Sequence, residues 1–221
     1  MKVGVIGSGG REHAICISLK KSKNIDKIYC FPGNAGTSFI AENIEIDLNN
    51  FEELKRVIKE LGIDIIIVGP EKPLVDGIVD FLEQNKIKVF GPNRVSSQLE
   101  GSKIFTKNLC KKYNIPTAKF GVFNSIQDSL SFLNECKFPI VVKADGLAAG
   151  KGVYICENND PSKKAVEEIF KGKFGKAKQI LIEEFLKGEE MSFFIISDVM
   201  SYKIFGTAQD HKRALEGDKG K

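Results

Sequence analysis

Short runs of β-branched and aliphatic residues end four times, in the first half of the chain, at a turn rich in glycine or proline. The turns lie at residues 7–10, 32–36, 69–71 and 91–92, and helical patterns separate the runs. Strand–helix alternation with short connections predicts a doubly wound sheet of parallel strands. Because the carboxyl ends of such strands share one edge, where open α/β sheets bind ligands, we expect the four turns to converge on one site.

Hydrophobic periodicity and capping residues place the individual elements. In the first half they predict helices at residues 10–20, 51–61 and 74–84, and strands at residues 3–6, 27–31, 44–48, 63–68 and 89–90. In the second half they predict helices at residues 96–113, 127–136 and from Pro161 onward, and strands at residues 117–123, 139–144, 153–156, 180–185, 192–196 and 203–208. The fold class is therefore an α/β domain with a parallel sheet, followed near residues 113–121 by an α+β module with an antiparallel sheet.

Composition excludes several classes of protein. The 221 residues carry 33 Lys+Arg against 29 Asp+Glu, and this mild excess is spread along the chain, so nucleic acid is not an expected partner. The aliphatic runs are too short to cross a bilayer, and residues 1–12 lack the pattern of a signal peptide. The five cysteines are never closer than fourteen positions and form no Cys-x-x-Cys pair, which indicates free thiols in the cytoplasm.

The first turn is a candidate anion site. Residues 7–12 read GSGGRE and open a helix, whose first amides favour a negative charge. A dinucleotide is disfavoured, because Glu12 stands where a third glycine would let the helix pack closely. In addition, Phe31 and Pro32 stand at the end of the second strand, where an acidic partner for the ribose is expected. A phosphate on a small ligand fits better, with the Arg11 guanidinium as a fork for it. The alternative is a plain glycine turn with Arg11 and Glu12 in solvent.

A second glycine-rich loop lies in the second half. Residues 146–152 read GLAAGKG, which is not a Walker A loop, because its glycines are one position too close and Gly152 replaces the magnesium-binding Ser or Thr. It joins two expected strands, and such a hairpin can cover phosphates. Lys143, in the apolar strand before it, would pair with an anion; the alternative is a solvent-facing lysine on a half-exposed strand.

Two polar clusters follow. Four carboxylates lie close together at the end of a strand, namely Glu183, Glu184, Glu189 and Glu190. They could form a charged turn, or a connector that reads adenine through its backbone and ribose through one carboxylate. His211 lies in the second cluster, at residues 209–213, but a lone histidine is weak support for a metal site.

Taken together, six segments resemble one family, the phosphoribosylamine–glycine ligases, also called glycinamide ribonucleotide synthetases, of the ATP-grasp superfamily. They are GSGGREHA at residues 7–14, PGNAG at 32–36, VGPEKPL at 68–74, VKADGLAAGKGV at 142–153, EEFLKGEE at 183–190 and QDHKR at 209–213. The resemblance runs in order from Met1 to the last residue. It implies a pre-ATP-grasp domain at residues 1–115, the ATP-grasp lid subdomain at 116–190 and the start of the larger ATP-grasp subdomain at 191–221, so the ATP-grasp domain is expected to be truncated.

The resemblance also implies a reaction. In the family, ATP phosphorylates the carboxylate of glycine, and the amine of 5-phosphoribosylamine attacks the acyl phosphate; the products are glycinamide ribonucleotide, ADP and phosphate. The expected ligands are ATP, glycine, 5-phosphoribosylamine and Mg²⁺ or Mn²⁺, and the oligomeric state is left undetermined. Two alternatives stay open: a non-catalytic chain that binds a nucleotide or sugar phosphate, and an ATP-grasp ligase acting on another acid.

Site residues are carried over position by position. The ATP set comprises Lys103, Lys143, Gly146, Gly150, Lys151, Gly152, Glu183, Glu184, Phe185, Leu186 and Glu190. The phosphoribosylamine set comprises Gly9, Gly10, Arg11, Asn34, Gly36 and Glu71. The reaction-centre set comprises Asp210, His211, Lys212 and Arg213.

No metal ligand is expected within these 221 residues. In the family the chain continues beyond a segment like EGDKG at residues 216–220, and the further part carries the acidic and Asn metal ligands and an arginine. We therefore expect the 221-residue chain alone to show no glycine-dependent release of ADP, and a longer chain to show it.

Overall fold

The computed structural model describes the chain except for residues 148–151, 176–177, 199, 210–214 and 217–221. The chain divides into two compact units, Met1–Glu184 and Phe185–Lys221. The expected reaction-centre set, Asp210 to Arg213, lies outside the described residues, as do Gly150 and Lys151.

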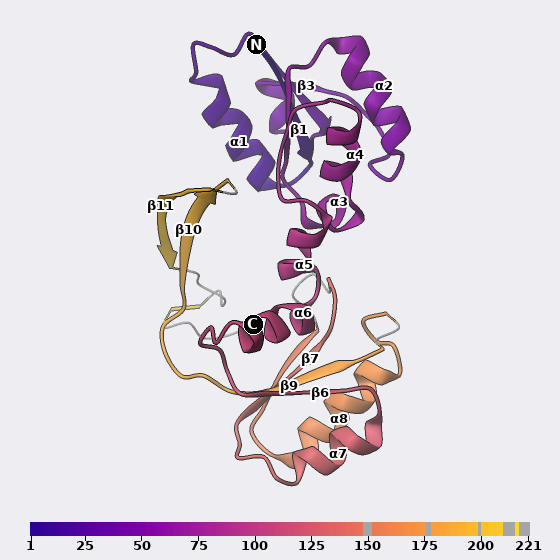
Figure 1. The fold of residues 1–221 in the computed structure, drawn as a ribbon, viewed down its shortest axis with the longest axis vertical. Coiled ribbons are helices and arrows are strands. Elements are labelled where there is room, and N and C mark those ends of the chain that lie inside the picture. The colour runs from indigo at the N-terminus through magenta and orange to yellow at the C-terminus, as the bar shows by residue number, and fades with distance from the viewer. Residues whose placement is uncertain (148–151, 176–177, 199, 210–214, 217–221) are drawn as a thin grey trace. The chain divides into compact units, whose positions relative to one another are not determined.

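The first unit begins with a five-stranded parallel sheet (Figure 1). Its strand order is β3-β2-β1-β4-β5, and the strands are β1 Lys2–Gly7, β2 Lys27–Pro32, β3 Glu42–Asn43, β4 Ile65–Val68 and β5 Val89–Phe90. The chain winds outward from the central β1 to β3 and then returns to β4 on the other side. The topological switch point therefore lies between β1 and β4, whose following turns are residues 7–10 and 69–71. The predicted doubly wound parallel sheet is confirmed.

Helices cover both faces of this sheet (Figure 1). Successive strand residues point to opposite faces, so Val5 packs in the cluster with Cys16 of α1 (Gly10–Lys20). Its neighbour Ile6 points to the other face. There it packs in the cluster that contains Leu54 of α2 (Phe51–Leu61) and Leu82 of α4 (Ile78–Gln84). Full burial of such an aliphatic side chain stabilises the fold by about 1.5–3 kcal/mol.

A second, four-stranded sheet follows in the same unit. Its order is β6-β9-β7-β8, with β6 Phe120–Phe123, β7 Ile140–Ala144, β8 Val153–Cys156 and β9 Ile180–Glu184. All its pairings are antiparallel, which confirms the predicted α+β module. Helices α7 (Ile126–Leu133) and α8 (Asn159–Phe170) pack on one face, through a core that includes Ile180 and Ile182. The alternate residues of β9, Leu181 and Glu183, therefore point to the opposite face.

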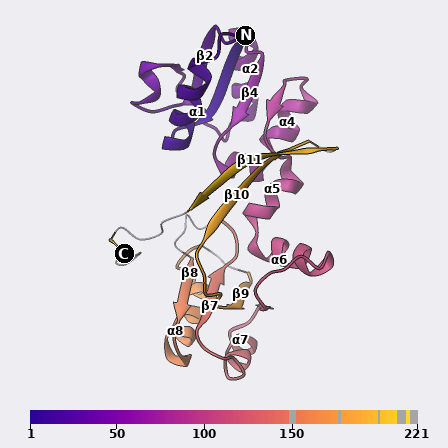
Figure 2. The ribbon, with the colours of Figure 1, turned by 90° about the vertical axis from the view of Figure 1, so that its left-hand side faces the viewer.

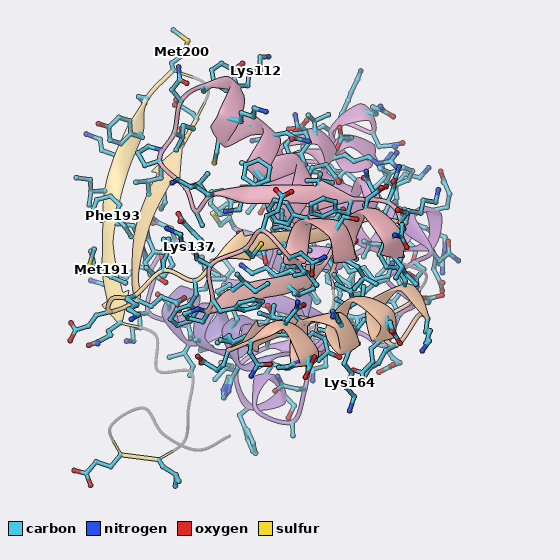
Figure 3. All side chains as sticks on the ribbon, turned by 90° about the horizontal axis from the view of Figure 1, so that it is seen from below. Lys112, Lys137, Lys164, Met191, Phe193 and Met200 are labelled. Carbon is cyan, nitrogen blue, oxygen red and sulfur yellow. The ribbon has the colours of Figure 1, made fainter. Side chains whose placement is uncertain are left out.

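The second unit contains an antiparallel hairpin, β10 (Met191–Ser197) and β11 (Tyr202–Gln209), whose strands run side by side in Figure 2. Apolar side chains are exposed on both strands, and Met191, Phe193 and Met200 are marked along the hairpin in Figure 3. Phe205 on β11 is 74% exposed.

Several element boundaries differ from the predictions. Residues 44–48 form no strand, and the third strand is the two-residue β3 just before them. The helix expected at residues 74–84 is two helices, α3 (Glu71–Asp76) and α4, because Gly77 between them is left-handed with φ 96°. The helix expected at residues 96–113 is also two, α5 (Arg94–Gly101) and α6 (Lys103–Lys112), because the extended Ser102 caps a new helix.

The remaining differences are smaller. The strand expected from residue 117 starts at Phe120, the helix expected to reach residue 136 ends at Leu133, and the strand expected to reach residue 185 ends at Glu184. A short 3-10 helix at Thr37–Phe39 follows the second turn.

Candidate functional site

Glu12 holds the first turn together from inside. Its side chain is only 3% exposed, and Oε2 accepts a 2.6 Å hydrogen bond from the amide of Gly9, the residue before α1. The alternative in which Glu12 lies in solvent is therefore wrong. The carboxylate folds back under the turn and completes the helix N-terminus, so the glycine-rich turn keeps a fixed shape.

The turn after β4 packs directly on the same carboxylate. A Cβ on Gly69 would lie 2.0 Å from Oε1 of Glu12, and a Cβ on Gly7 would lie 2.6 Å from its Cδ. Only glycine fits at either position, since real Cβ atoms do not approach other atoms this closely. Glu12 thus joins the two turns at the switch point of the sheet.

The Arg11 guanidinium binds to other residues of the chain. Its Nη1 donates a 2.7 Å hydrogen bond to the carbonyl oxygen of Gly69, and Nη2 lies 2.9 Å from the Glu71 carboxylate. Burial raises the pKa of Glu71, but a hydrogen bond with its own backbone and the Arg11 guanidinium lower it, and the net pKa is below the ordinary value. The Arg11 guanidinium, expected to bind a phosphate, is therefore already paired with a carboxylate of the same chain.

The side-chain amide of Asn34 makes hydrogen bonds to two loops. Nδ2 donates to the carbonyl oxygens of Ser8 at 2.9 Å and Gly9 at 3.2 Å. Oδ1 accepts from the amides of Gly36 at 2.7 Å and Thr37 at 3.0 Å. Both donors and both acceptor positions of the amide are thus filled, so Asn34 shapes the loops instead of offering its side chain to a ligand.

Gly36 lies against α1. A Cβ at this position would lie 2.5 Å from the imidazole ring of His13. Of the predicted phosphoribosylamine set, four residues line one cleft of about 540 Å³ beside the switch point, namely Gly9, Gly10, Arg11 and Glu71. Asn34 and Gly36 do not line it and act through the neighbouring loops.

A larger cleft, of about 730 Å³, lies where α6 faces the second sheet. Lys103 and Lys143, both expected at the ATP phosphates, line it together with Gly146 and Gly152. The glycine-rich loop joins the antiparallel strands β7 and β8, as predicted, and the amide of Ala144 donates to the carbonyl of Gly152 at 2.8 Å across its base.

Asp145 ties the glycine-rich loop to α6. Its carboxylate accepts hydrogen bonds from the Ser102 hydroxyl at 3.0 and 3.1 Å and from the Ile104 amide at 3.2 Å. Lys103 adds a 2.9 Å hydrogen bond from Nζ to the carbonyl of Gly146. A carboxylate at a helix N-terminus is favourable, so the loop and the helix hold each other in place.

Burial lowers the pKa of Lys103, the nearby Asp145 raises it in part, and Lys143 lowers it further. Burial and the nearby Lys143 therefore disfavour the charged ammonium more than Asp145 and Glu100 favour it. An anion bound beside Lys103 would stabilise the ammonium and raise its pKa.

The sequence did not single out Lys107, which also lines the larger cleft. Its Nζ lies 2.7 Å from Oε2 of the buried Glu183, and Lys143 pairs with the other carboxylate oxygen. Glu183 was expected in a connector that reads adenine, but its side chain is an internal counter-ion for two lysines. Lys107 lies four positions after Lys103 on one helix, and this spacing, which puts both on one helix face, was the available signal.

The rest of the predicted ATP set lies at the end of the first unit or beyond it. Glu184 is exposed at the end of β9, and its Oε1 accepts a 2.9 Å hydrogen bond from the amide of Lys119. Phe185, Leu186 and Glu190 belong to the second unit.

The two clefts have a common wall. Pro70, Glu71 and Lys72 line both the 540 Å³ cleft and the 730 Å³ cleft. Most residues that line the 540 Å³ cleft come from the domain with the parallel sheet. Most of the others that line the 730 Å³ cleft come from α6 and the module with the antiparallel sheet. Ligands bound in them would therefore be neighbours.

Among the described residues, no group of three or more His, Cys, Asp and Glu side chains could hold a metal ion. None of the helices in that part of the chain is long and apolar enough to span a membrane. All five cysteines are free thiols, and three of them, Cys16, Cys30 and Cys156, are buried.

Comparison with solved structures defines the class of fold. The chain matches N5-carboxyaminoimidazole ribonucleotide synthetase from Thermotoga maritima with a TM-score of 0.69 at 20% identity, over 94% of this chain and 53% of that one. It matches the phosphoribosylamine–glycine ligase of the same organism with a TM-score of 0.84 at 32% identity, over 100% of this chain and 53% of that one. The architecture is a parallel α/β domain followed by an ATP-grasp domain.

Sequence comparison gives the family. Residues 1–100 match the profile described as "Phosphoribosylglycinamide synthetase, N domain", and residues 101–221 match "Phosphoribosylglycinamide synthetase, ATP-grasp (A) domain". The chain belongs to the phosphoribosylglycinamide synthetase family, which confirms the resemblance read from its six segments.

Curated relatives agree with this assignment. The chain is 46% identical over 221 residues to the phosphoribosylamine–glycine ligase of Mesorhizobium japonicum and 48% identical over 221 residues to that of Brucella melitensis. Each match covers 100% of this chain and 52% of the relative. The chain thus spans about half the length of these relatives.

Proposed function

We propose that this chain is part of a ligase that joins glycine to 5-phosphoribosylamine at the expense of ATP, giving glycinamide ribonucleotide, ADP and phosphate. The protein would act in the cytoplasm in purine synthesis, on small molecules and not on nucleic acid. The observation that carries the proposal is the pair of clefts that share the wall at residues 70–72. In this reaction ATP phosphorylates the carboxylate of glycine, and the amine of the phosphosugar then displaces the phosphate, so the nucleotide and the phosphosugar require neighbouring sites.

The smaller cleft would hold 5-phosphoribosylamine. The amides at the start of α1, including those of Gly9 and Gly10, favour a phosphate. Arg11 and Glu71 would be available to it as a linked donor and acceptor, since they already form an ion pair at the cleft wall. Asn34 and Glu12 would keep the two turns in place.

The larger cleft would hold ATP. Its size is within the usual range for small-molecule sites, and the charged residues along its wall are four lysines and two glutamates, namely Lys72, Lys103, Lys107, Lys143, Glu71 and Glu100. The lowered pKa of Lys103 supports the same assignment, because the negative charge of a phosphate would stabilise its partly buried ammonium. Fixed cations of this kind stabilise the charge that develops during phosphoryl transfer.

ATP-grasp ligases of this family use ATP with a divalent metal, and we propose Mg²⁺ or Mn²⁺. The described residues offer no cluster of acidic ligands for it, and the lysines would contact the phosphates directly, without the metal between them. The roles of Asp210, His211, Lys212 and Arg213 at the reaction centre, and the domain limits at residues 115 and 190, remain parts of the proposal.

The test measures release of ADP in the presence of ATP, glycine and 5-phosphoribosylamine. It uses the chain alone and the chain joined to the part of the Mesorhizobium japonicum relative that it does not match. We expect the joined protein to release ADP only when all three substrates are present. ATP binding without release by either protein would favour a binding chain, and release with another acid in place of glycine would favour a different ligase.

Lys103 is expected to make ATP binding depend on pH. A bound phosphate raises its lowered pKa, so the complex holds more protons than the free protein between the two values. ATP affinity should therefore fall as the pH rises through the lowered pKa, which lies below the ordinary 10.5. Calorimetry at a series of pH values below 10.5, in two buffers of different ionisation enthalpy, should show proton uptake. Uptake that persists in Lys103→Met would assign it to another group.

A further inference from the structure

Lys107 is a buried lysine beside the proposed ATP cleft. It lies on the second turn of α6, and its side chain is 12% exposed. Nζ donates to the Thr117 hydroxyl at 2.7 Å and to the carbonyl of Ala118 at 3.3 Å, and it lies 5.5 Å from the centre of the Phe120 ring. These contacts fix the ammonium in one position.

The partner of this ammonium is Glu183, whose side chain is 6% exposed. One carboxylate oxygen pairs with Lys143, and the other lies 2.7 Å from Lys107. That second oxygen, Oε2, accepts no hydrogen bond from the described residues, so Lys107 acts on it through charge. Two ammonium groups around one carboxylate leave an excess of one positive charge on the face of the sheet that lines the cleft.

We infer that Lys107 is a positioning residue for ATP: it neutralises Glu183 and thereby leaves Lys143 free to bind a phosphate. The inference rests on the proposed function, because it assigns Lys143 to the nucleotide. Lys107 would act on ATP through Glu183 and Lys143. Its own hydrogen bonds go to Thr117 and Ala118.

The physical reason is competition for one cation. Charges attract more strongly in a water-poor site than in bulk water. Without Lys107, the whole charge of Glu183 would act on Lys143 and hold it away from the phosphates. With Lys107 in place, the carboxylate is shared, and Lys143, which is 25% exposed, keeps a net attraction for an anion in the cleft.

The two exposed fractions agree with this division of roles. Lys107 is the more deeply buried of the two lysines, and Lys143 is the more accessible to a ligand. A purely structural lysine would support the whole cleft, so its loss would weaken binding of adenosine and ATP alike. A lysine that acts through Lys143 would affect only ligands that carry phosphates.

The experiment titrates the chain and its variants with ATP by calorimetry and with adenosine by NMR. Lys107→Met should weaken ATP binding about tenfold and leave adenosine binding within about twofold. Lys107→Arg, which keeps the charge, should restore most of the ATP affinity. Lys111→Met, an exposed lysine in the last turn of the same helix, is the matched control and should change neither affinity.

The decisive variant removes the competitor as well. Adding Glu183→Gln to Lys107→Met should restore ATP affinity to within about threefold, because a neutral amide no longer holds Lys143. Glu183→Gln alone should not weaken ATP binding. This single variant still tests the inference if circular dichroism shows that Lys107→Met does not fold.

Three results would overturn the inference: a double variant that binds ATP as weakly as Lys107→Met, an equal loss of adenosine and ATP binding, or weaker ATP binding in Glu183→Gln alone. If the unmodified chain binds ATP and none of the variants differs from it, only the inference fails. If the unmodified chain does not bind ATP, the proposed function itself is contradicted.

Discussion

Gly69→Ala is expected to destabilise the chain by about 2 kcal/mol and to weaken binding of ribose 5-phosphate about tenfold. The new Cβ would lie 2.0 Å from Oε1 of Glu12 and 2.6 Å from its Cδ. Glu12 cannot move aside freely, because its buried carboxylate accepts the hydrogen bond from Gly9. Either that bond breaks, leaving the buried Glu12 carboxylate without this partner, or the turn after β4 moves away. Both outcomes deform the smaller cleft.

Urea denaturation measures the loss of stability, and calorimetry with ribose 5-phosphate measures the loss of binding. Gly10→Ala is the control for stability, because a Cβ there has no atom within 4 Å. Its free energy of unfolding should stay within about 0.5 kcal/mol of that of the unmodified chain. If Gly69→Ala unfolds at the same urea concentration as the unmodified chain, the close packing of Glu12 between the two turns is wrong.

Lys143→Ala is expected to reduce affinity for ATP by about tenfold to a hundredfold. The side chain lines the larger cleft, and its removal also leaves Glu183 with Lys107 as its remaining ionic partner. The loss should be larger for ATP than for adenosine. It should also reduce the salt dependence of ATP binding, since one charge contact is gone.

Calorimetry at two salt concentrations measures both effects. Lys137→Ala is the matched control, because Lys137 lies shortly before the same strand and is exposed. It should change ATP affinity by less than about twofold. Unchanged ATP affinity in Lys143→Ala would contradict the assignment of this lysine to the phosphates.

The sequence predicted the parts of the fold that depend on local patterns. The parallel sheet follows from aliphatic runs that end at glycine or proline, and the switch point follows from their order. Boundaries were less predictable where one residue decides them: Gly77 and Ser102 each divide a continuous helical pattern. Residues 44–48 have the composition of a strand but make no strand pairing, because strand pairing depends on a neighbour that the local sequence does not specify.

The sequence predicted which segments line the two clefts better than it predicted the role of each side chain. Lys103 and Lys143 line one cleft as expected, and Arg11 and Glu71 line the other. What the side chains do there depends on contacts between residues far apart in the chain. The pairing of Lys107 with Glu183 crosses 76 positions, and no spacing rule reaches that far. Glu12 also could not be placed, because its burial depends on Gly69 in a different turn.

The shared wall at residues 70–72 has a thermodynamic consequence. These residues begin α3 and line both clefts, so a displacement of this segment changes the shape of the two clefts at once. Binding energies in the two clefts are then coupled through one structural element. Such coupling is reciprocal: the factor by which one ligand changes the affinity for the other is the same in both directions. The turn that Gly69 and Glu12 hold in place would therefore affect the coupling between ligands bound in the two clefts.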